Sequence, residues 1–358
     1  MTTQDITNLI KSAMAGDTKA QIELGIAYYN GDGIKQDRVE AFNWFKKAAE
    51  LGSATGQFHL GMCYEVGIGV PQNYVEAYTW YLKAAEQGNI QAQVCLSNLY
   101  LEGKGVEKNA EKHLKWCLKA AEGGHSSAQL GIAELYFTGT GGLMQNYTKA
   151  AMWFLQSAKN GEVEAHYYLA VMYEHGYGVT KNHTEALRWL REAAERGYAV
   201  AQYCLGDMYE TGSGVIKQDY AEAAKWYLKA AEQGDPTAQH NLGNLYWKGR
   251  GVNKNWPEAV RWYRKAAEQG LAISQYNLGI LYLGVDFPSS ETGIGQDVNE
   301  AVNWFRRAAI QGDAPSQYHL GLAYQYGLGG LPVNKALASK WKTMAEKQGY
   351  HPNSRKQQ

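Results

Sequence analysis

The chain has 358 residues, and its 35 Lys and Arg side chains balance 35 Asp and Glu side chains, so its formal net charge is zero. This balance argues against a nucleic-acid-binding protein, which carries a basic surface, and no stretch approaches the ~18 consecutive apolar residues of a membrane span. The N-terminal residues MTTQDITNLIKSAMAGD lack the positive cluster and the apolar run of a secretory signal. We therefore expect a cytoplasmic protein, although a signal removed beforehand would leave no trace in this sequence.

The first predicted element is a short helix at residues 6–16. It matches the second half of the repeats that follow, with Asn8 in place of their tryptophan. Because the end of a stack of repeats needs a polar outer face, we interpret residues 1–19 as an N-terminal capping helix.

From Ala20 onward one motif recurs nine times: A-Q-x-x-L-G-x-x-Y, then G-x-G-V, then A-x-x-W-x-x-K-A-A-x-x-G. Its tyrosines lie 36 or 37 residues apart, except for 42 in the last interval, and a fixed period in this range is typical of solenoids. Nine of the 11 tryptophans occupy a single repeat position, which makes them core residues and not a stacking site. The tyrosine and tryptophan of the successive repeats are Tyr28 and Trp44, Tyr64 and Trp80, Tyr100 and Trp116, Tyr136 and Trp153, Tyr173 and Trp189, Tyr209 and Trp226, Tyr246 and Trp262, Tyr282 and Trp304, and Tyr324 and Trp341.

Each repeat is predicted to be a pair of helices, as the sixth repeat, Ala201–Gly234, shows most clearly. Its first half, Ala201–Tyr209, spaces apolar residues along one helical face and ends at the glycines of a Gly-Ser-Gly turn. Its second half, residues 219–233, carries a second apolar stripe and is closed by Gly234. Alanines and Gly206 are expected to let the helix backbones approach closely, while tyrosine and tryptophan fill the gaps between layers.

Some repeats depart from the motif. In the third, Ser97 replaces the glycine and His113 an alanine, so we expect either His113 to point outward or a looser helix contact. The turns at residues 139–143 and 327–331 share a second pattern, which we interpret as a second turn type. In the eighth repeat the turn is lengthened at residues 284–295; a tolerated surface insertion and a functional loop both fit. We expect residues 350–358 to form a frayed tail.

The motif A-x-x-x-L-G-x-x-Y-x-x-G-x-G-V…A-x-x-W-x-x-K-A-A resembles the Sel-one-like repeat, a relative of the tetratricopeptide repeat. The resemblance covers residues 20–349 and implies an all-α fold, an α/α solenoid of about nine two-helix repeats coiled into one continuous right-handed superhelix. It also implies a scaffold or adaptor for other proteins, generally without catalysis. Bacterial relatives often accompany toxins, so an immunity partner that neutralises a toxin is one alternative, and a self-assembling structural element is another.

The sequence offers little for chemistry. The cysteines, Cys63, Cys95, Cys117 and Cys204, contain no C-x-x-C pair, and we expect reduced, partly buried thiols. The nine histidines show no zinc-ligand spacing, and the G-x-G-V turns follow helices and not strands, unlike a dinucleotide loop. We therefore expect no enzyme, no metal and no cofactor. The glutamine after the first alanine of a repeat is interpreted as a hydrogen bond to the neighbouring repeat, and the lysine of each K-A-A run as a solvated side chain.

A partner would be recognised by the surface that varies between repeats. Positions three, six and ten after the first alanine share one face of the first helix, away from the core, at ~100° per residue. In tetratricopeptide-like superhelices the first helices line the concave groove. Asparagine amides both donate and accept hydrogen bonds and so suit an extended peptide backbone, Lys248 suits a carboxylate, and an ordinary solvated helix face is the alternative. The candidate partner-binding residues are Asn98, Glu102, Glu134, His175, Asp207, Asn241, Asn244, Lys248 and Asn277.

Overall fold

The computed structural model describes residues 3–213, 215–284, 292–293 and 295–351. All regular structure in this part of the chain is α-helical. The chain divides into two compact units, unit 1 (Met1–Asn182) and unit 2 (His183–Gln358). Among the described residues no helix is both long enough and apolar enough to cross a membrane.

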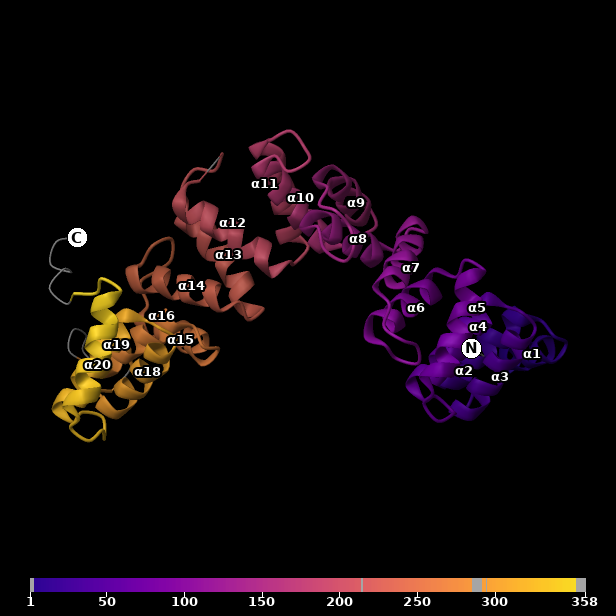
Figure 1. Cartoon of the computed structure of the whole chain (residues 1–358), viewed down its shortest axis with the longest axis horizontal. Helices are drawn as coiled ribbons and strands as arrows, with labels where there is room; N and C mark the ends of the chain where they lie inside the picture. The colour runs from indigo at the N-terminus through magenta and orange to yellow at the C-terminus, as the bar shows by residue number, and fades with distance from the viewer. Residues whose placement is uncertain (1–2, 214, 285–291, 294, 352–358) are drawn as a thin grey trace. The chain divides into compact units, whose positions relative to one another are not determined.

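Unit 1 is a row of helical hairpins (Figure 1). Each second helix of a repeat packs against the first helix of its own repeat and against that of the next repeat. The helices are α1 (Thr3–Met14), α2 (Thr18–Asn30), α3 (Arg38–Glu50), α4 (Ala54–Val66), α5 (Tyr74–Glu86), α6 (Ile90–Glu102), α7 (Ala110–Glu122), α8 (Ser126–Thr138), α9 (Tyr147–Lys159) and α10 (Val163–His175).

Unit 2 repeats this arrangement. Its described helices are α11 (His183–Glu195), α12 (Ala199–Thr211), α13 (Tyr220–Glu232), α14 (Pro236–Lys248), α15 (Trp256–Glu268), α16 (Ala272–Leu283), α18 (Val298–Ile310), α19 (Ala314–Tyr326) and α20 (Lys335–Lys347). The sixth repeat therefore contains the two predicted helices, with α12 beginning two residues before Ala201 and Asp219 serving as the N-cap of α13.

Short polar side chains begin most of the described helices, and glycines end the first helix of each hairpin. In the second repeat Ser53 accepts a hydrogen bond from the Gly56 backbone N–H, and Asn73 does the same for Val75 at the start of α5. The backbone of Gly67 has φ of 82° and its N–H bonds the Cys63 carbonyl. A left-handed residue that closes a helix in this way is most often glycine, which explains the invariant turn position of the motif.

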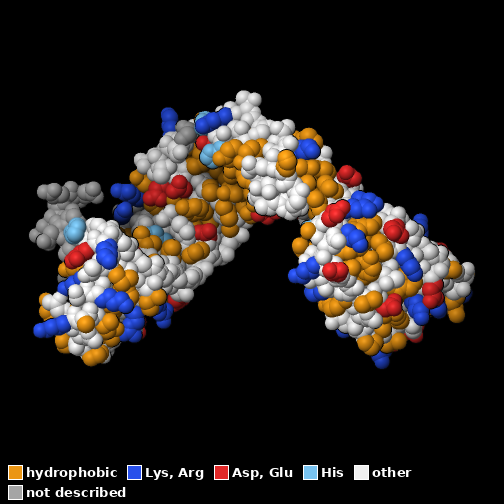
Figure 2. Space-filling model, in the orientation of Figure 1, with side chains coloured by type: hydrophobic (Ala, Val, Ile, Leu, Met, Phe, Trp, Pro, Cys, Tyr) orange, Lys and Arg blue, Asp and Glu red, His pale blue; other side chains and the backbone are white. Residues whose placement is uncertain are grey.

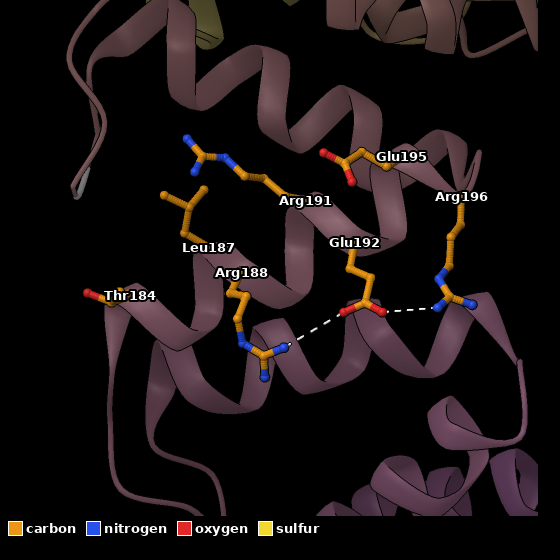
Figure 3. A pocket seen from close by; sticks show the side chains of 7 residues that line it. All are labelled: Thr184, Leu187, Arg188, Arg191, Glu192, Glu195 and Arg196. Carbon is orange, nitrogen blue, oxygen red and sulfur yellow. Dashed lines mark hydrogen bonds and ion pairs between the residues drawn. The ribbon is translucent and has the colours of Figure 1, made fainter.

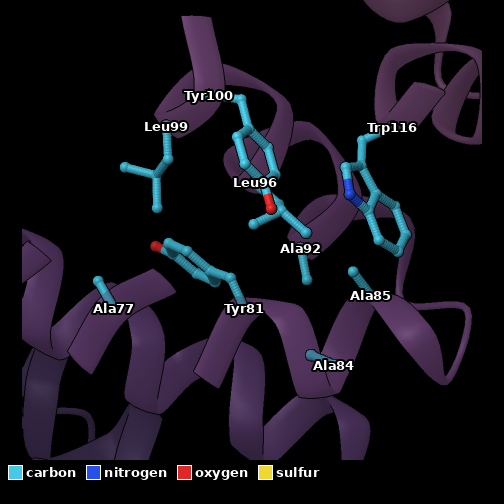
Figure 4. Packing of buried hydrophobic residues seen from close by; sticks show 9 residues of the cluster. All are labelled: Ala77, Tyr81, Ala84, Ala85, Ala92, Leu96, Leu99, Tyr100 and Trp116. Carbon is cyan, nitrogen blue, oxygen red and sulfur yellow. The ribbon is translucent and has the colours of Figure 1, made fainter. Parts of the chain in front are cut away.

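The core between neighbouring hairpins consists of small residues around large rings, as Figure 4 shows for the second and third repeats. Tyr81 and Trp116 are buried there among alanines and leucines. A Cβ atom placed on Gly61 would lie 2.6 Å from the Tyr81 ring, and one on Gly206 would lie 2.7 Å from the Tyr227 ring. This differs from our expectation for Gly206: the missing side chain makes room for an aromatic ring, not for a neighbouring backbone.

The repeat glutamines confirm the predicted bond between neighbours. Gln57 Nε2, for example, donates to the Ala49 carbonyl of the preceding hairpin at 3.4 Å. Its Oε1 accepts from Gln87 Nε2 at 2.7 Å. We call the recurring set of these bonds the glutamine ladder and the pair of bonds in one repeat a rung; each full rung joins three helix ends. Two rungs are incomplete, because the buried Oε1 atoms of Gln21 and Gln93 have no hydrogen-bond partner. In those repeats Leu51 and Gly123 stand where Gln87 stands in the second.

The two substitutions in the third repeat face each other. Ser97 Oγ lies 2.9 Å from His113 Nδ1 and donates to the His113 carbonyl at 3.0 Å. His113 is half-buried, so the expectation that it points outward is wrong. The serine hydroxyl satisfies the imidazole that replaces the usual alanine.

The turns and the chain end also bear on the sequence predictions. The turns at 139–143 and 327–331 share the predicted second type, since each closes with a backbone bond, Leu143 to Thr140 and Leu331 to Leu328. Most of the insertion at 284–295 lies outside the described residues, as do residues 352–358 of the tail. Tyr350 is packed rather than frayed, because its ring lies 5.7 Å from that of Tyr318 and its N–H bonds the Ala345 carbonyl.

Candidate functional site

Three of the predicted partner-binding residues share one face of α14 in unit 2. Asn241 and Asn244 are half-buried and Lys248 is exposed. Asn241 Nδ2 donates to the Tyr227 hydroxyl at 3.2 Å, and the Tyr263 hydroxyl donates to Asn244 Oδ1 at 2.7 Å. Internal hydrogen bonds therefore use one polar atom of each of these amides. Asn241 Oδ1 and Asn244 Nδ2 remain for contacts with a peptide backbone.

The tyrosines beneath these amides remain uncharged donors. Burial raises the pKa of both Tyr227 and Tyr263 far above the ordinary range. Tyr227 also donates to Glu210 at 2.8 Å, which further disfavours the phenolate. Because the two hydroxyls are fixed, they orient the Asn241 and Asn244 side chains on the α14 surface.

Beside the amides lie the two tryptophans that stand outside the repeat position, Trp247 at the end of α14 and Trp256 at the start of α15. Their rings stack with centroids 5.5 Å apart, and Trp256 Nε1 donates to the Trp247 carbonyl at 3.2 Å. Lys254 Nζ lies 4.1 Å from the Trp256 ring centre. We refer to Asn241, Asn244, Trp247, Lys248 and Trp256 together as the repeat-seven patch.

The patch and the turn that follows α14 carry positive charge. Lys248, Arg250 and Lys254 are all exposed, and residues 236–257 contain no Asp or Glu. Burial, and then the charge of Lys248, lowers the pKa of His240 to about 4, so this neighbour is neutral at physiological pH. A hollow of about 360 Å³ lies at the edge of the patch, lined by Lys254, Asn255, Trp256 and Pro257.

The other predicted residues of unit 2 lie on neighbouring first helices. Asp207 is exposed on α12, and Asn277 is half-buried on α16.

The predicted residues of unit 1 occupy three helices. Asn98 is exposed on α6, and Glu102 at the end of that helix forms an ion pair with Lys104 at 2.5 Å. Glu134 on α8 is half-buried, and burial raises the pKa of its carboxyl although a hydrogen bond from Tyr168 opposes the rise. His175 is exposed at the end of α10, with its ring 5.3 Å from that of Tyr177.

A hollow of about 640 Å³ in unit 2 is lined by side chains of α11 and by Arg196, the residue that follows it (Figure 3). Most of its charged side chains have partners within the unit. Glu192 pairs with Arg188 at 3.8 Å and with Arg196 at 3.0 Å, and Arg191 donates to the Tyr209 hydroxyl at 3.2 Å. Side chains paired in this way form a solvated helix face, so the repeat-seven patch is the better candidate.

The cysteines and the lysines of the K-A-A runs pack against neighbouring side chains. Burial raises the pKa of the Cys63 thiol to about 12 and those of Cys95 and Cys204 to about 11, so these thiols stay protonated. The lysines of the K-A-A runs lie over the repeat tryptophans, as Lys47 does at 3.8 Å from the Trp44 ring centre. Among the described residues no group of three or more His, Cys, Asp or Glu is placed to hold a metal ion.

On the visible face of each unit in Figure 2, acidic and basic side chains are interspersed with hydrophobic and uncharged ones.

Sequence reasoning missed the aromatic part of the site. Trp247 and Trp256 were distinguishable from the other tryptophans, because they alone fall outside the repeat position and flank one turn. The positions of Tyr227 and Tyr263 directly after the repeat tryptophan were visible too, but the direction of their hydroxyls was not.

Hairpins that stack in this way define an all-α solenoid of two-helix repeats. The Sel1 repeat model matches residues 18–53, 54–89, 90–125, 126–162, 163–198, 199–235, 236–271, 272–313 and 314–350. The chain therefore belongs to the Sel1 repeat family, whose members are generally protein-interaction scaffolds.

Solved structures agree with this assignment. The chain is 33% identical to a protective antigen of uropathogenic Escherichia coli that displays an SLR fold, with a TM-score of 0.75 and coverage of 96% of this chain and 80% of that one. It is also 33% identical to a Sel1 repeat protein from Oxalobacter formigenes, with a TM-score of 0.67 and coverage of 89% and 90%. No curated protein matches the chain.

An immunity protein from Pseudomonas aeruginosa matches with 17% identity and a TM-score of 0.36, covering 64% of this chain and 83% of that one. A likeness at this level carries no argument about function.

Proposed function

We propose that this chain is a non-catalytic scaffold that binds an extended peptide segment of a partner protein at the repeat-seven patch. The observation that carries the proposal is the side-by-side placement of oriented amides, stacked tryptophans and exposed positive charge on α14, in the turn after it and at the start of α15.

Each component fits a different part of a peptide. Asn241 Oδ1 suits a backbone N–H and Asn244 Nδ2 a backbone carbonyl, because both amides are already held in place by tyrosine hydroxyls. The Trp247 and Trp256 rings offer apolar contact area, and rigid aromatic side chains often dominate the energy of interfaces. Lys248 and Lys254 favour a segment that carries carboxylates.

The sharpest test changes charge and leaves the internal bonds of the amides intact. The Lys248→Glu/Lys254→Glu variant keeps Asn241 and Asn244 on their tyrosines and should bind the natural partner at least tenfold more weakly. Affinity capture from the native host, followed by titration of the captured protein, measures this. An Asn241, Asn244 and Lys248 triple-alanine variant is less specific, because it also removes the acceptor of the buried Tyr263 hydroxyl.

The matched control is Lys217→Glu/Lys335→Glu, which makes the same change of charge at exposed positions of unit 2 outside the patch. It should bind like the wild type. If both double variants retain full affinity with an intact fold, the patch is not the binding surface.

We also propose that the chain works in the cytoplasm. The four free cysteines are compatible with a reducing compartment. Fractionation of the native host with an antibody against the chain tests this directly.

A further inference from the structure

Five aromatic rings meet in the fourth and fifth repeats of unit 1. Phe137 at the end of α8 is central, with its ring centre 5.3 Å from Tyr147, 6.2 Å from Phe154, and 6.0 Å from both Tyr168 and Tyr177. We call these five residues the Phe137 cluster. It is only partly covered: Phe154 is buried, but Tyr177 exposes 36% of its surface and the other three are half-buried.

Two stacks build the cluster. Tyr177 lies on Tyr147 with centroids 4.8 Å apart and planes at 19°, and Tyr168 lies on Phe154 at 4.6 Å and 10°. Tyr177 is the middle residue of the Gly-x-Gly turn after α10, and Tyr147 is the first residue of α9 in the preceding repeat.

Two other repeats show what the same position binds. In the third repeat the middle residue of the turn is Lys104, whose Nζ lies 5.5 Å from the ring of Tyr74, the first residue of α5. In the seventh it is Arg250, which lies 5.3 Å from the ring of Tyr220, the first residue of α13. In both repeats the chain places a cation of its own on this half-buried tyrosine.

The three turns have the same backbone geometry. A Cβ on the second glycine of each turn would meet the carbonyl oxygen of the preceding repeat's tyrosine, at 2.1 Å for Gly105 and Tyr74, 2.2 Å for Gly251 and Tyr220, and 2.3 Å for Gly178 and Tyr147. Tyr177 therefore stands where a cation stands in the other two repeats, and it presents a ring instead of a charge.

Acidic side chains lie beside the rings. Glu134 accepts a hydrogen bond from Tyr168, and the charge of Glu164 acts on both groups. A ring face attracts a cation through its quadrupole, and nearby carboxylates reinforce the attraction. The third repeat offers a precedent, because Lys104 contacts the Tyr74 ring and the Glu102 carboxylate together.

We propose that the Phe137 cluster binds an arginine or lysine side chain from a basic segment of a partner protein. The inference rests on the scaffold role proposed above but not on the repeat-seven patch, since the cluster lies wholly in unit 1. The cluster gives the chain a second contact surface. It prefers positively charged side chains, whereas the repeat-seven patch prefers carboxylates.

The test uses the full chain and two synthetic peptides, acetyl-Ser-Gly-Arg-Gly-Arg-Gly-Ser-amide and its version with both arginines replaced by glutamine. Ligand-detected NMR titration at physiological salt should show the arginine peptide binding at millimolar or better affinity and the glutamine peptide at least tenfold more weakly. The Tyr177→Lys variant copies the Lys104 arrangement and places an internal cation on Tyr147. It should keep its melting temperature and lose about tenfold in affinity for the arginine peptide.

The Tyr177→Phe variant keeps the ring and should bind the arginine peptide like the wild type. It shows whether substitution at this position by itself disturbs the fold or the binding. Equal binding of both peptides, full affinity in Tyr177→Lys, or no binding of the arginine peptide to the wild type would overturn the proposal. The Lys248→Glu/Lys254→Glu variant should still bind the arginine peptide, whatever it does to the natural partner. The two proposals can therefore fail independently.

Discussion

At the scale of single residues, polar side chains are placed where a buried partner needs them. Ser97 accompanies His113, Asn244 accompanies Tyr263, and Ser274 Oγ lies 2.8 Å from His240 Nδ1. A buried polar group without a partner costs about 1–3 kcal/mol, so such substitutions are tolerated in pairs.

His240 leads to a prediction about acid. Burial and the charge of Lys248 lower its pKa from 6.5 to about 4. Between these values the unfolded chain binds a proton that the folded chain does not, so the free energy of unfolding of unit 2 should fall as pH drops through this window. The full difference corresponds to about 3 kcal/mol. Urea unfolding at several pH values between 7 and 4 measures it.

The matched control for this prediction is His240→Tyr/Ser274→Ala, which copies Tyr203 and Ala238, the residues at these positions one repeat earlier. It should lose less stability on acidification than the wild type. Identical losses in both proteins would show that His240 is not the responsible group.

At the scale of helices, the hydrogen bonds of the repeat glutamines explain why many repeats carry a glutamine both after the first alanine and before the last glycine. The bond from Gln57 to Ala49 joins one hairpin to the one before it, and the bond from Gln87 to Gln57 closes the hairpin itself. Equivalent bonds recur in both units, for example from Gln239 to Ala231 and from Gln269 to Gln239.

The incomplete rung at Gln21 leads to a second prediction. Leu51 is 60% exposed, so its replacement removes little buried apolar surface, and Leu51→Gln would supply the donor that Gln21 Oε1 lacks. We expect this change to stabilise unit 1 by about 1 kcal/mol, measured by chemical unfolding. Leu51→Glu has the same size without the donor and should give no gain. If Leu51→Glu stabilises as much, the hydrogen bond is not the cause.

The sequence was sufficient for the helices and insufficient for the details of the candidate site. Periodic apolar residues and glycine stops predict α12 and α13 to within about two residues because those signals are local. The engagement of Asn241 and Asn244 depends instead on tyrosines 14 residues before and 19 residues after them in the chain. Tyr177 likewise stacks on Tyr147, which lies one repeat earlier in the chain. The spacing of residues within a single helix therefore reveals neither the amide–tyrosine bonds nor this stack.

At the scale of the whole molecule, we expect the stability of each repeat to depend on its contacts with the neighbouring repeats. We propose that α1 caps the first repeat, because Ile6 is only 6% exposed, Ala13 is buried, and Gln21 Nε2 donates to the Ala13 carbonyl at 3.0 Å. The opposite face of the helix carries exposed polar side chains.

The cap can be tested by Ile6→Ala, which should cost about 2–4 kcal/mol by removing buried methyl groups. Hydrogen exchange should speed up most in α1, α2 and α3 and hardly at all in α9, because each repeat contacts only its neighbours. Met14→Ala is the control, since Met14 on the same helix is 75% exposed. Uniform loss of protection from α2 to α9 would contradict nearest-neighbour coupling.

The middle residue of the Gly-x-Gly turn contacts a tyrosine of the preceding repeat, and this has a consequence for how such a gene can change. Each such contact belongs to two consecutive repeats, because one repeat supplies the tyrosine and the next supplies the residue that lies on its ring. A crossover that joined the fourth repeat to the seventh would bring Arg250 onto Tyr147 and erase the open face. Joining the sixth to the fifth would bring Tyr177 onto Tyr220 but without Phe137, because Glu210 stands at that position. Unequal recombination can therefore change which residue covers a repeat tyrosine without any point mutation.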